Sequence, residues 1–116
     1  MIKAKRGEEK RLFERKRLRS RVVFEDESGE GFIYFYSTDV SSGGIFFESD
    51  VPLKIGTKVF LSFNLPPENK IVRATGTVVR VEREKGGATV LGMGIQFVDI
   101  TDQAQQQLDQ YIKGTV

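Results

Sequence analysis

The chain lacks three residue types that carry much of protein chemistry, since its 116 residues include no cysteine, histidine or tryptophan. Without cysteine there is no disulfide, thiolate nucleophile or thiolate-bound zinc, and this absence is compatible with a reducing compartment. Without histidine there is no imidazole base, Ser-His-Asp triad or histidine-bound metal. Catalysis would depend on carboxylates, Lys, Tyr or Ser alone, so the composition disfavours an enzyme, a metal site and a cofactor site.

Long apolar stretches are missing as well. No segment approaches the roughly 20 apolar residues that a membrane-spanning helix needs. The first 21 residues are rich in charge and lack the apolar run of a secretion signal. The length suits one domain with one modest core. We therefore expect a soluble single-domain protein of the cytoplasm.

The near-neutral net charge of +2 hides an asymmetry. Residues 1–21 hold ten Lys or Arg against three Glu, whereas residues 22–116 hold eight Lys or Arg against thirteen Asp or Glu. A basic segment of this kind attracts phosphates, nucleic acid or an anionic membrane surface, or serves only as a solvated tail. Residues 1–16 have few apolar anchors. They are predicted to form a flexible basic arm in front of a folded domain at 17–116.

From Val22 onward, apolar residues alternate with polar ones, which is typical of strands with one buried face. The alternation breaks phase at Val78-Val79 and predicts a bulge near Gly76. Runs of Gly, Ser, Asn and Pro separate the alternating segments as turns. Short antiparallel strands at this spacing favour a small barrel or sandwich. Six strands are predicted, near 21–25, 32–38, 44–49, 58–65, 71–84 and 89–98.

The C-terminal residues change to the period of a helix. Thr101 suits an N-cap and Gly114 suits a C-terminal stop, which predicts a helix over 101–113. Its apolar side chains share one face, which we expect to pack on one end of the barrel. These side chains belong to Ala104, Leu108, Tyr111 and Ile112.

Two short patterns carry potential chemistry. Arg17 and Arg21 form R-x-x-x-R directly before the first strand, although Arg15 and Arg19 share the spacing and leave the register open. An arm so rich in arginine produces this pattern easily by chance. The pattern therefore gains meaning only together with the second one.

The second pattern is D-x-S-x-x-G, formed by Asp39, Ser41 and Gly44 between two predicted strands. Asp and Ser often bond the backbone of their own turn, and Gly accepts positive φ, so a plain turn explains the pattern by itself. On the residues alone this plain turn is the favoured interpretation, and a role in chemistry is the alternative.

The order of these features resembles the PilZ domain, a bacterial receptor for cyclic di-GMP. The resemblance covers about residues 14–113. It includes Gly92-Met-Gly94-Ile-Gln-Phe97, which is similar to the glycine–aliphatic–x–Phe strand of that family. It implies an all-β fold with one C-terminal helix, namely a six-stranded antiparallel barrel closed by that helix.

The resemblance also implies a ligand site. Arg17 and Arg21 would contact guanine and phosphate, and Asp39, Ser41 and Gly44 would form the opposite wall. Lys16 stands where many members have Arg, at a position linked to whether one ligand or a stacked pair binds, so the number of ligands stays open. The alternative register uses Arg15 and Arg19 in place of the first pair.

The function implied is a cyclic di-GMP receptor that changes conformation and signals in trans to an unidentified effector protein. Typical targets of the family are the flagellar motor, exopolysaccharide synthesis and pili.

The main alternative is a nucleic-acid-binding small barrel with a basic arm, for which Tyr34 and Tyr36 would be stacking platforms. An acidic body makes that alternative less favourable, and we expect both tyrosines to pack against the helix or a neighbouring strand. The hypothesis of carboxylate catalysis by Asp99 and Asp102 has less support still. Both residues flank the predicted helix start, where acidic side chains complement the helix dipole.

Overall fold

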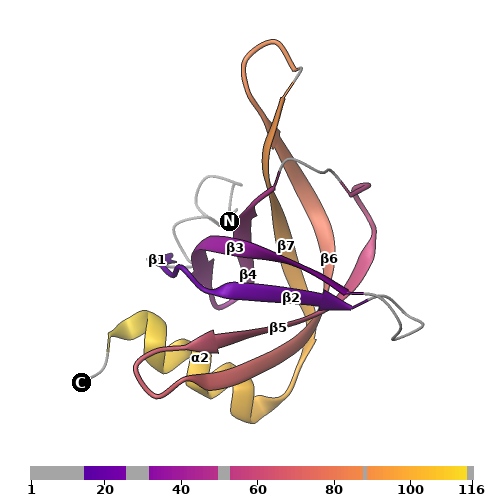
Figure 1. Ribbon diagram of the computed structural model, residues 1–116. Helices are drawn as coiled ribbons and strands as arrows, with labels where there is room; N and C mark the ends of the chain where they lie inside the picture. The colour runs from indigo at the N-terminus through magenta and orange to yellow at the C-terminus, as the bar shows by residue number, and fades with distance from the viewer. Residues whose placement is uncertain (1–14, 26–31, 50–52, 88, 115–116) are drawn as a thin grey trace, which may run out of the picture.

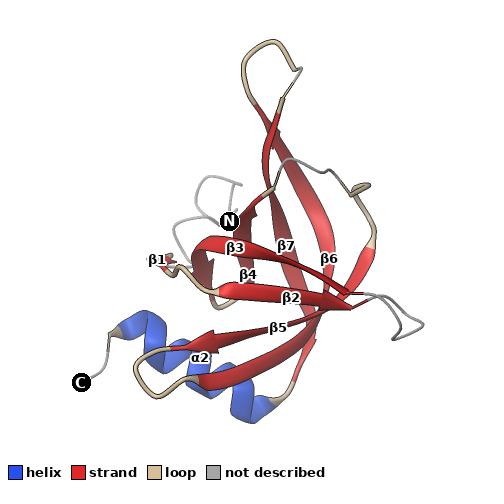
Figure 2. Ribbon diagram, in the orientation of Figure 1, coloured by secondary structure: helices blue, strands red, loops and turns tan. Residues whose placement is uncertain are grey.

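The computed structural model describes residues 15–25, 32–49, 53–87 and 89–114, and strands make up most of them (Figure 2). A 12-residue helix follows the last strand. The elements in chain order are β1 (Lys16–Arg17), β2 (Arg21–Glu25), β3 (Phe32–Ser41), β4 (Gly44–Glu48), β5 (Lys58–Leu65), β6 (Lys70–Arg83), β7 (Val90–Ile100) and α2 (Asp102–Lys113).

Six of the strands close into an antiparallel barrel in the order β3-β2-β5-β6-β7-β4, because β4 also pairs with β3 (Figure 1). This confirms the predicted six-stranded barrel and its C-terminal helix. The sequence did not predict β1, a two-residue strand that continues along β3 beyond the end of β2. Residues 16–25 therefore pair with β3 in two successive stretches, first through β1 and then through β2.

The alternating residues of the strands fill the barrel as predicted. Along β5, every second side chain from Val59 to Leu65 is buried, while the side chains between them reach the surface. Three aromatic rings from neighbouring strands pack edge-on or tilted in the core, with centroids 4.9–5.4 Å apart. These rings belong to Phe24, Phe35 and Phe47.

The predicted break in β6 is present as an irregularity in its pairing with β7. Val78 pairs with Ile95 and Arg80 with Gly94, so Val79 has no partner residue in the register. Val78 is fully buried, whereas Val79 is 47% exposed. A second shift in register follows Thr75, next to Gly76. These bulges allow the long β6–β7 hairpin to bend and extend away from the barrel (Figure 1).

The helix α2 begins and ends as predicted. The Thr101 hydroxyl accepts from the backbone N–H of Ala104, and Gly114 ends the helix in the left-handed conformation. Ala104 and Leu108 are buried against the barrel. Of the predicted arm, Lys16 lies in β1, residue 15 is also described, and residues 1–14 lie outside the described part of the chain. Within the described residues, no helix has the length and hydropathy that a membrane span requires.

Candidate functional site

The two halves of the R-x-x-x-R pattern lie beside β3, the strand that carries Asp39. Arg17 is directly opposite Asp39, and Arg21 is directly opposite Tyr36. Opposed residues of an antiparallel pair project from the same face of a sheet. The pairing therefore brings Arg17 and Asp39, 22 positions apart in the sequence, to one face of the barrel wall.

A buried serine holds the chain between β1 and β2. The Ser37 hydroxyl donates to the Leu18 carbonyl and accepts from the Ser20 N–H at 3.0 Å, and Ser37 is fully buried. Leu18 is buried as well. With Leu18 turned inward, the exposed side chains of this segment are those of Arg17, Arg19 and Arg21. The sequence analysis missed Ser37, since no local pattern distinguishes it from any other strand serine.

The Asp39 carboxylate is partly exposed and already has two partners. Arg15 Nη1 lies 2.5 Å from Asp39 Oδ1, and the Thr38 hydroxyl donates to Oδ2 at 3.2 Å. A register shift in the β3–β4 pairing leaves Thr38 and Asp39 together at the surface between buried Ser37 and buried Val40. The cation that contacts Asp39 in the structure is thus Arg15, a member of the alternative register.

Ser41 and Gly44 have structural partners inside the β3–β4 turn. Ser41 is 3% exposed, and its hydroxyl lies 3.4 Å from the Gly44 carbonyl and 3.3 Å from the Gly43 N–H. A Cβ added at Gly44 would lie 2.2 Å from the Ile95 carbonyl oxygen of β7. The missing side chain of Gly44 therefore makes room for the β7 backbone. The turn explanation accounts for Ser41 but not for Gly44, which does not have the positive φ that this explanation invoked.

Lys16 is directed to the C-terminal end of α2. Its Nζ donates to the Tyr111 carbonyl at 2.9 Å and lies 4.2 Å from the centre of the Tyr111 ring. The Tyr111 hydroxyl donates in turn to the Arg17 carbonyl at 3.0 Å. Burial raises the pKa of the Tyr111 hydroxyl above its usual value of 10.0. A cation at a helix C-terminus also complements the helix dipole, so Lys16 joins β1 to α2.

The other two arginines of this segment lie over aromatic rings. The Arg19 guanidinium carbon is 4.7 Å from the Tyr36 ring centre, and that of Arg21 is 5.2 Å from the Tyr34 ring centre. Tyr34 is 50% exposed and Tyr36 is 43% exposed. The expectation that these tyrosines pack against a neighbouring strand therefore holds for Tyr34, which contacts Arg21 of β2, whereas Tyr36 contacts Arg19, which lies outside the strands. Outward alternation along β3 places both rings at the surface, where cationic side chains cover them.

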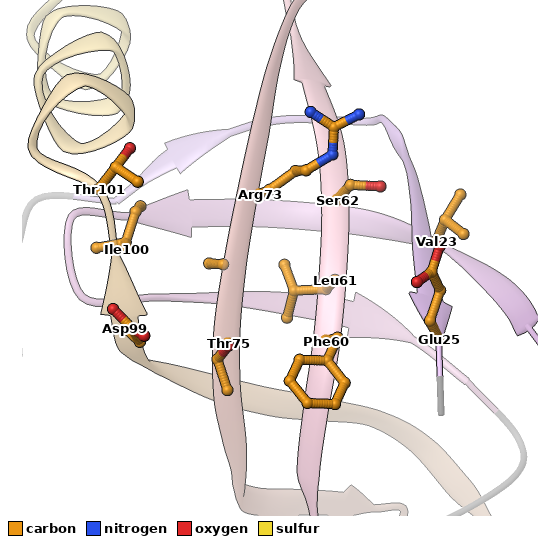
Figure 3. Close-up of a pocket in the computed structure, with 11 residues that line it drawn as sticks. Val23, Glu25, Phe60, Leu61, Ser62, Arg73, Thr75, Asp99, Ile100 and Thr101 are labelled. Atoms are coloured by element: carbon orange, nitrogen blue, oxygen red, sulfur yellow. The ribbon is translucent and has the colours of Figure 1, made fainter. Parts of the chain in front are cut away.

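A separate hollow of about 320 Å³ lies on the outer face of β2, β5, β6 and β7 (Figure 3). Arg73 and Ser62 lie at one end, and the Phe60 ring lies nearer the other. None of the predicted ligand residues lines it. Among the described residues, no group of three or more acidic, His or Cys side chains is arranged to hold a metal ion.

Solved structures share this fold at low sequence identity. The inhibitor of motility MotI (DgrA) of Bacillus subtilis matches with 20% identity and a TM-score of 0.76, covering 97% of this chain and 51% of that chain. The PilZ domain of YcgR from Escherichia coli, solved with cyclic di-GMP, matches with 15% identity and a TM-score of 0.67, covering 88% of each chain. The MrkH–cyclic di-GMP complex of K. pneumoniae matches with 17% identity and a TM-score of 0.65, covering 95% of this chain and 51% of that chain.

This chain thus spans about half the length of MotI and MrkH. No curated protein matches it in sequence. The family model described as the PilZ domain, however, matches residues 9–114, which include the whole barrel and its helix. The chain therefore belongs to the PilZ domain family.

Proposed function

We propose that this protein is a receptor for cyclic di-GMP. The observation that carries the proposal is the register of β1 on β3, which sets Arg17 opposite Asp39 with Arg21 farther along the same wall. The PilZ family match supports it, as do the matched structures of YcgR and MrkH that contain cyclic di-GMP. We propose the binding of this ligand and no catalytic role.

The chemistry of the ligand fits these side chains. Guanine presents O6 and N7 as paired acceptors, which an arginine fork contacts in a bidentate manner. Its N1–H and N2–H donors suit a carboxylate such as Asp39. The two phosphodiesters carry a charge of −2, which the exposed guanidinium groups of Arg17 and Arg21 complement. Arg17 and Arg21 lie opposite Asp39 and Tyr36, which are three positions apart on β3, so the two arginine backbones are roughly 10 Å apart and their side chains can reach both halves of the ligand.

The proposed ligand set keeps the residues that the sequence indicated. Ser41 would shape the turn at the wall of the site, and Gly44 would allow β4 to pair closely with β7 beside it. The register that uses Arg15 and Arg19 remains the alternative assignment. The complete set is Lys16, Arg17, Arg21, Asp39, Ser41 and Gly44.

A conformational change follows from the contact between Arg15 and Asp39. If guanine takes the Asp39 carboxylate, Arg15 must leave it, and the segment that continues into β1 rearranges. Ordering or reordering of a segment by charge-assisted contacts is an established mode of switching. We propose that the rearranged surface signals in trans to an effector protein in the cytoplasm, in a pathway such as motility, which the match to MotI favours.

Calorimetric titration of the full chain with cyclic di-GMP tests the proposal. Arg17→Ala, Arg21→Ala and Asp39→Ala each remove a charge-assisted contact, which costs about 1.5–3 kcal/mol, or roughly 10- to 150-fold in affinity. Arg83→Ala is the control, because Arg83 is an exposed arginine of the distant β6–β7 hairpin. Amide hydrogen exchange over residues 10–21, of which the structure describes 15–21, should slow when the ligand binds.

Three results would count against this assignment. A wild-type chain that does not bind cyclic di-GMP would overturn the proposed function. A single-stranded oligonucleotide that displaces the ligand at moderate salt would favour the nucleic-acid-binding alternative. A severe loss in Arg19→Ala together with a mild loss in Arg21→Ala would show that the alternative register is the correct one.

A further inference from the structure

The outer face of β3 carries a row of side chains that the ligand motifs do not include. Tyr34 and Tyr36 project outward on the strand that leads to Asp39, and their rings pack edge-on with centroids 6.1 Å apart. Both rings are about half exposed. Tyr36 is also the residue that lies directly opposite Arg21. An exposed aromatic face therefore sits between the proposed arginine and the proposed carboxylate.

A flat cationic group already lies over the Tyr36 ring. The Arg19 guanidinium lies over it at 4.7 Å, and Arg19 Nη1 is also 3.7 Å from Glu48 Oε1. Guanidinium planes and purines both stack on aromatic faces, and base stacking does not depend on hydrogen bonds to the platform. Arg19 is exposed, so its side chain can move aside at small cost. The same ring face is then open to a base.

The spacing along β3 selects Tyr36 over Tyr34. Asp39 is three positions after Tyr36, or about 10 Å along an extended strand, and five positions after Tyr34, or about 16 Å. A purine that stacks on Tyr36 would extend over part of the distance to Asp39, with its hydrogen-bond donor edge facing that carboxylate. Arg21, opposite Tyr36, is then placed to reach the acceptor edge.

We propose that the Tyr36 ring is a stacking platform for one guanine base of cyclic di-GMP. This inference rests on the proposed function and adds a contact that the arginine and D-x-S-x-x-G patterns do not contain. In the bound arrangement the base lies flat on Tyr36, Asp39 accepts from its N1–H and N2–H, and Arg21 donates to its O6 and N7. The selectivity for guanine comes from the two polar edges, and the ring supplies affinity.

Paired substitutions at one position test the contact in the full chain. Tyr36→Leu should weaken cyclic di-GMP binding about 5- to 150-fold, the range that the loss of one base–aromatic stack produces. Tyr36→Phe keeps the ring and should stay within about twofold of wild type. Phe60→Leu is the matched control, because Phe60 also carries a cation over its ring, Lys58 at 5.6 Å, but lies in the separate hollow (Figure 3). Circular dichroism checks that each variant is folded.

A direct contact is distinguished from a structural effect by NMR. Nuclear Overhauser contacts between the Tyr36 ring protons and guanine H8 are expected in the complex. Their absence from a saturated complex, or unchanged affinity in Tyr36→Leu while Arg21→Ala binds weakly, would overturn the stacking contact and leave the proposed function standing. A wild-type chain that does not bind cyclic di-GMP would instead remove the proposed function and this inference together.

Discussion

Two residues of the D-x-S-x-x-G pattern, Ser41 and Gly44, have structural roles in the barrel. Gly44 is buried where β4 crosses close to β7, and Ser41 is enclosed by its own turn. Asp39 differs from both, because its carboxylate reaches the surface and contacts a cation there. Loss of function after mutation therefore has different physical causes at the three positions.

Gly44→Ala should destabilise the fold. The new Cβ would lie 2.2 Å from a backbone oxygen of Ile95, which cannot move aside as a flexible side chain would. Crowding of this kind costs about 1–3 kcal/mol in the free energy of unfolding, which urea titration measures. Gly94→Ala is the control, because its new Cβ would meet only side-chain atoms at 3.6 Å. Equal stability of the two variants would contradict the crowding at Gly44.

Arg15→Gln should tighten the binding of cyclic di-GMP. In the proposed register Arg15 competes with the ligand for Asp39, and an exposed ion pair of this kind is worth about 0–1 kcal/mol. Calorimetry should therefore show a gain in affinity of up to about fivefold. Weaker binding would instead place Arg15 among the ligand contacts.

At the scale of elements, the first strand and the last helix are joined by Tyr111. Lys16 and Arg17 make up β1, and both contact Tyr111 in the last turns of α2. A strand of two residues has little pairing of its own. The helix therefore contributes to holding the proposed arginine segment in place, and a change in that segment reaches α2 directly.

Tyr111→Phe should lower stability by about 0.5–1.5 kcal/mol at neutral pH, because the hydrogen bond to the Arg17 carbonyl is lost. Since burial raises the pKa of Tyr111 in the folded state, the folded protein holds the phenol proton more tightly than the unfolded chain. The stabilisation that the protonated Tyr111 hydroxyl contributes is complete below pH about 10. It is lost as the pH rises through the pKa of Tyr111 in the folded state.

Urea titrations between pH 7 and 11 measure this effect. The difference in unfolding free energy between wild type and Tyr111→Phe should shrink toward the alkaline end. Tyr34→Phe, which removes the hydroxyl of an exposed ring, controls for general alkaline destabilisation. A difference that stays constant across this range would rule out the Tyr111 proton as its source.

At the scale of the whole molecule, the barrel is closed by β4, which pairs with β3 on one side and with β7 on the other. Phe47 of β4 is fully buried and packs against rings from β2 and β3. The same strand positions β3, and with it Asp39, through its register. The geometry of the proposed site therefore depends on the same strand pairing that closes the barrel.

Phe47→Ala should cost about 3–5 kcal/mol, because it removes a buried ring and leaves a cavity between three strands. That is a large share of the 5–15 kcal/mol typical of a domain, so partial unfolding at room temperature is expected. Thermal unfolding followed by circular dichroism measures it. Val79→Ala, at the exposed bulge residue, should change stability by less than about 0.5 kcal/mol. A Phe47→Ala variant as stable as this control would contradict the proposed role of the aromatic core.

The sequence by itself determined the six barrel strands and the C-terminal helix of this protein. Alternation predicted six strands and, from the break in phase at Val78-Val79, a bulge near Gly76, where the pairing of β6 with β7 shifts. Capping residues bounded the helix at Thr101 and Gly114. These features depend on neighbours within a few residues. Together with the two short motifs they were sufficient to indicate the family. The limits of the N-terminal arm and the assignment of the ligand residues stay predictions.

Only the tertiary structure decided which residues meet. The sequence indicated neither that Arg15 contacts Asp39, nor that Gly44 leaves room for Ile95, nor that Tyr36 lies exposed opposite Arg21. Each of these facts depends on strand register and barrel closure, which join positions 15 or more residues apart. A pattern of nearest neighbours contains the period of a strand but not its register, because the register is set by how all the buried faces pack together.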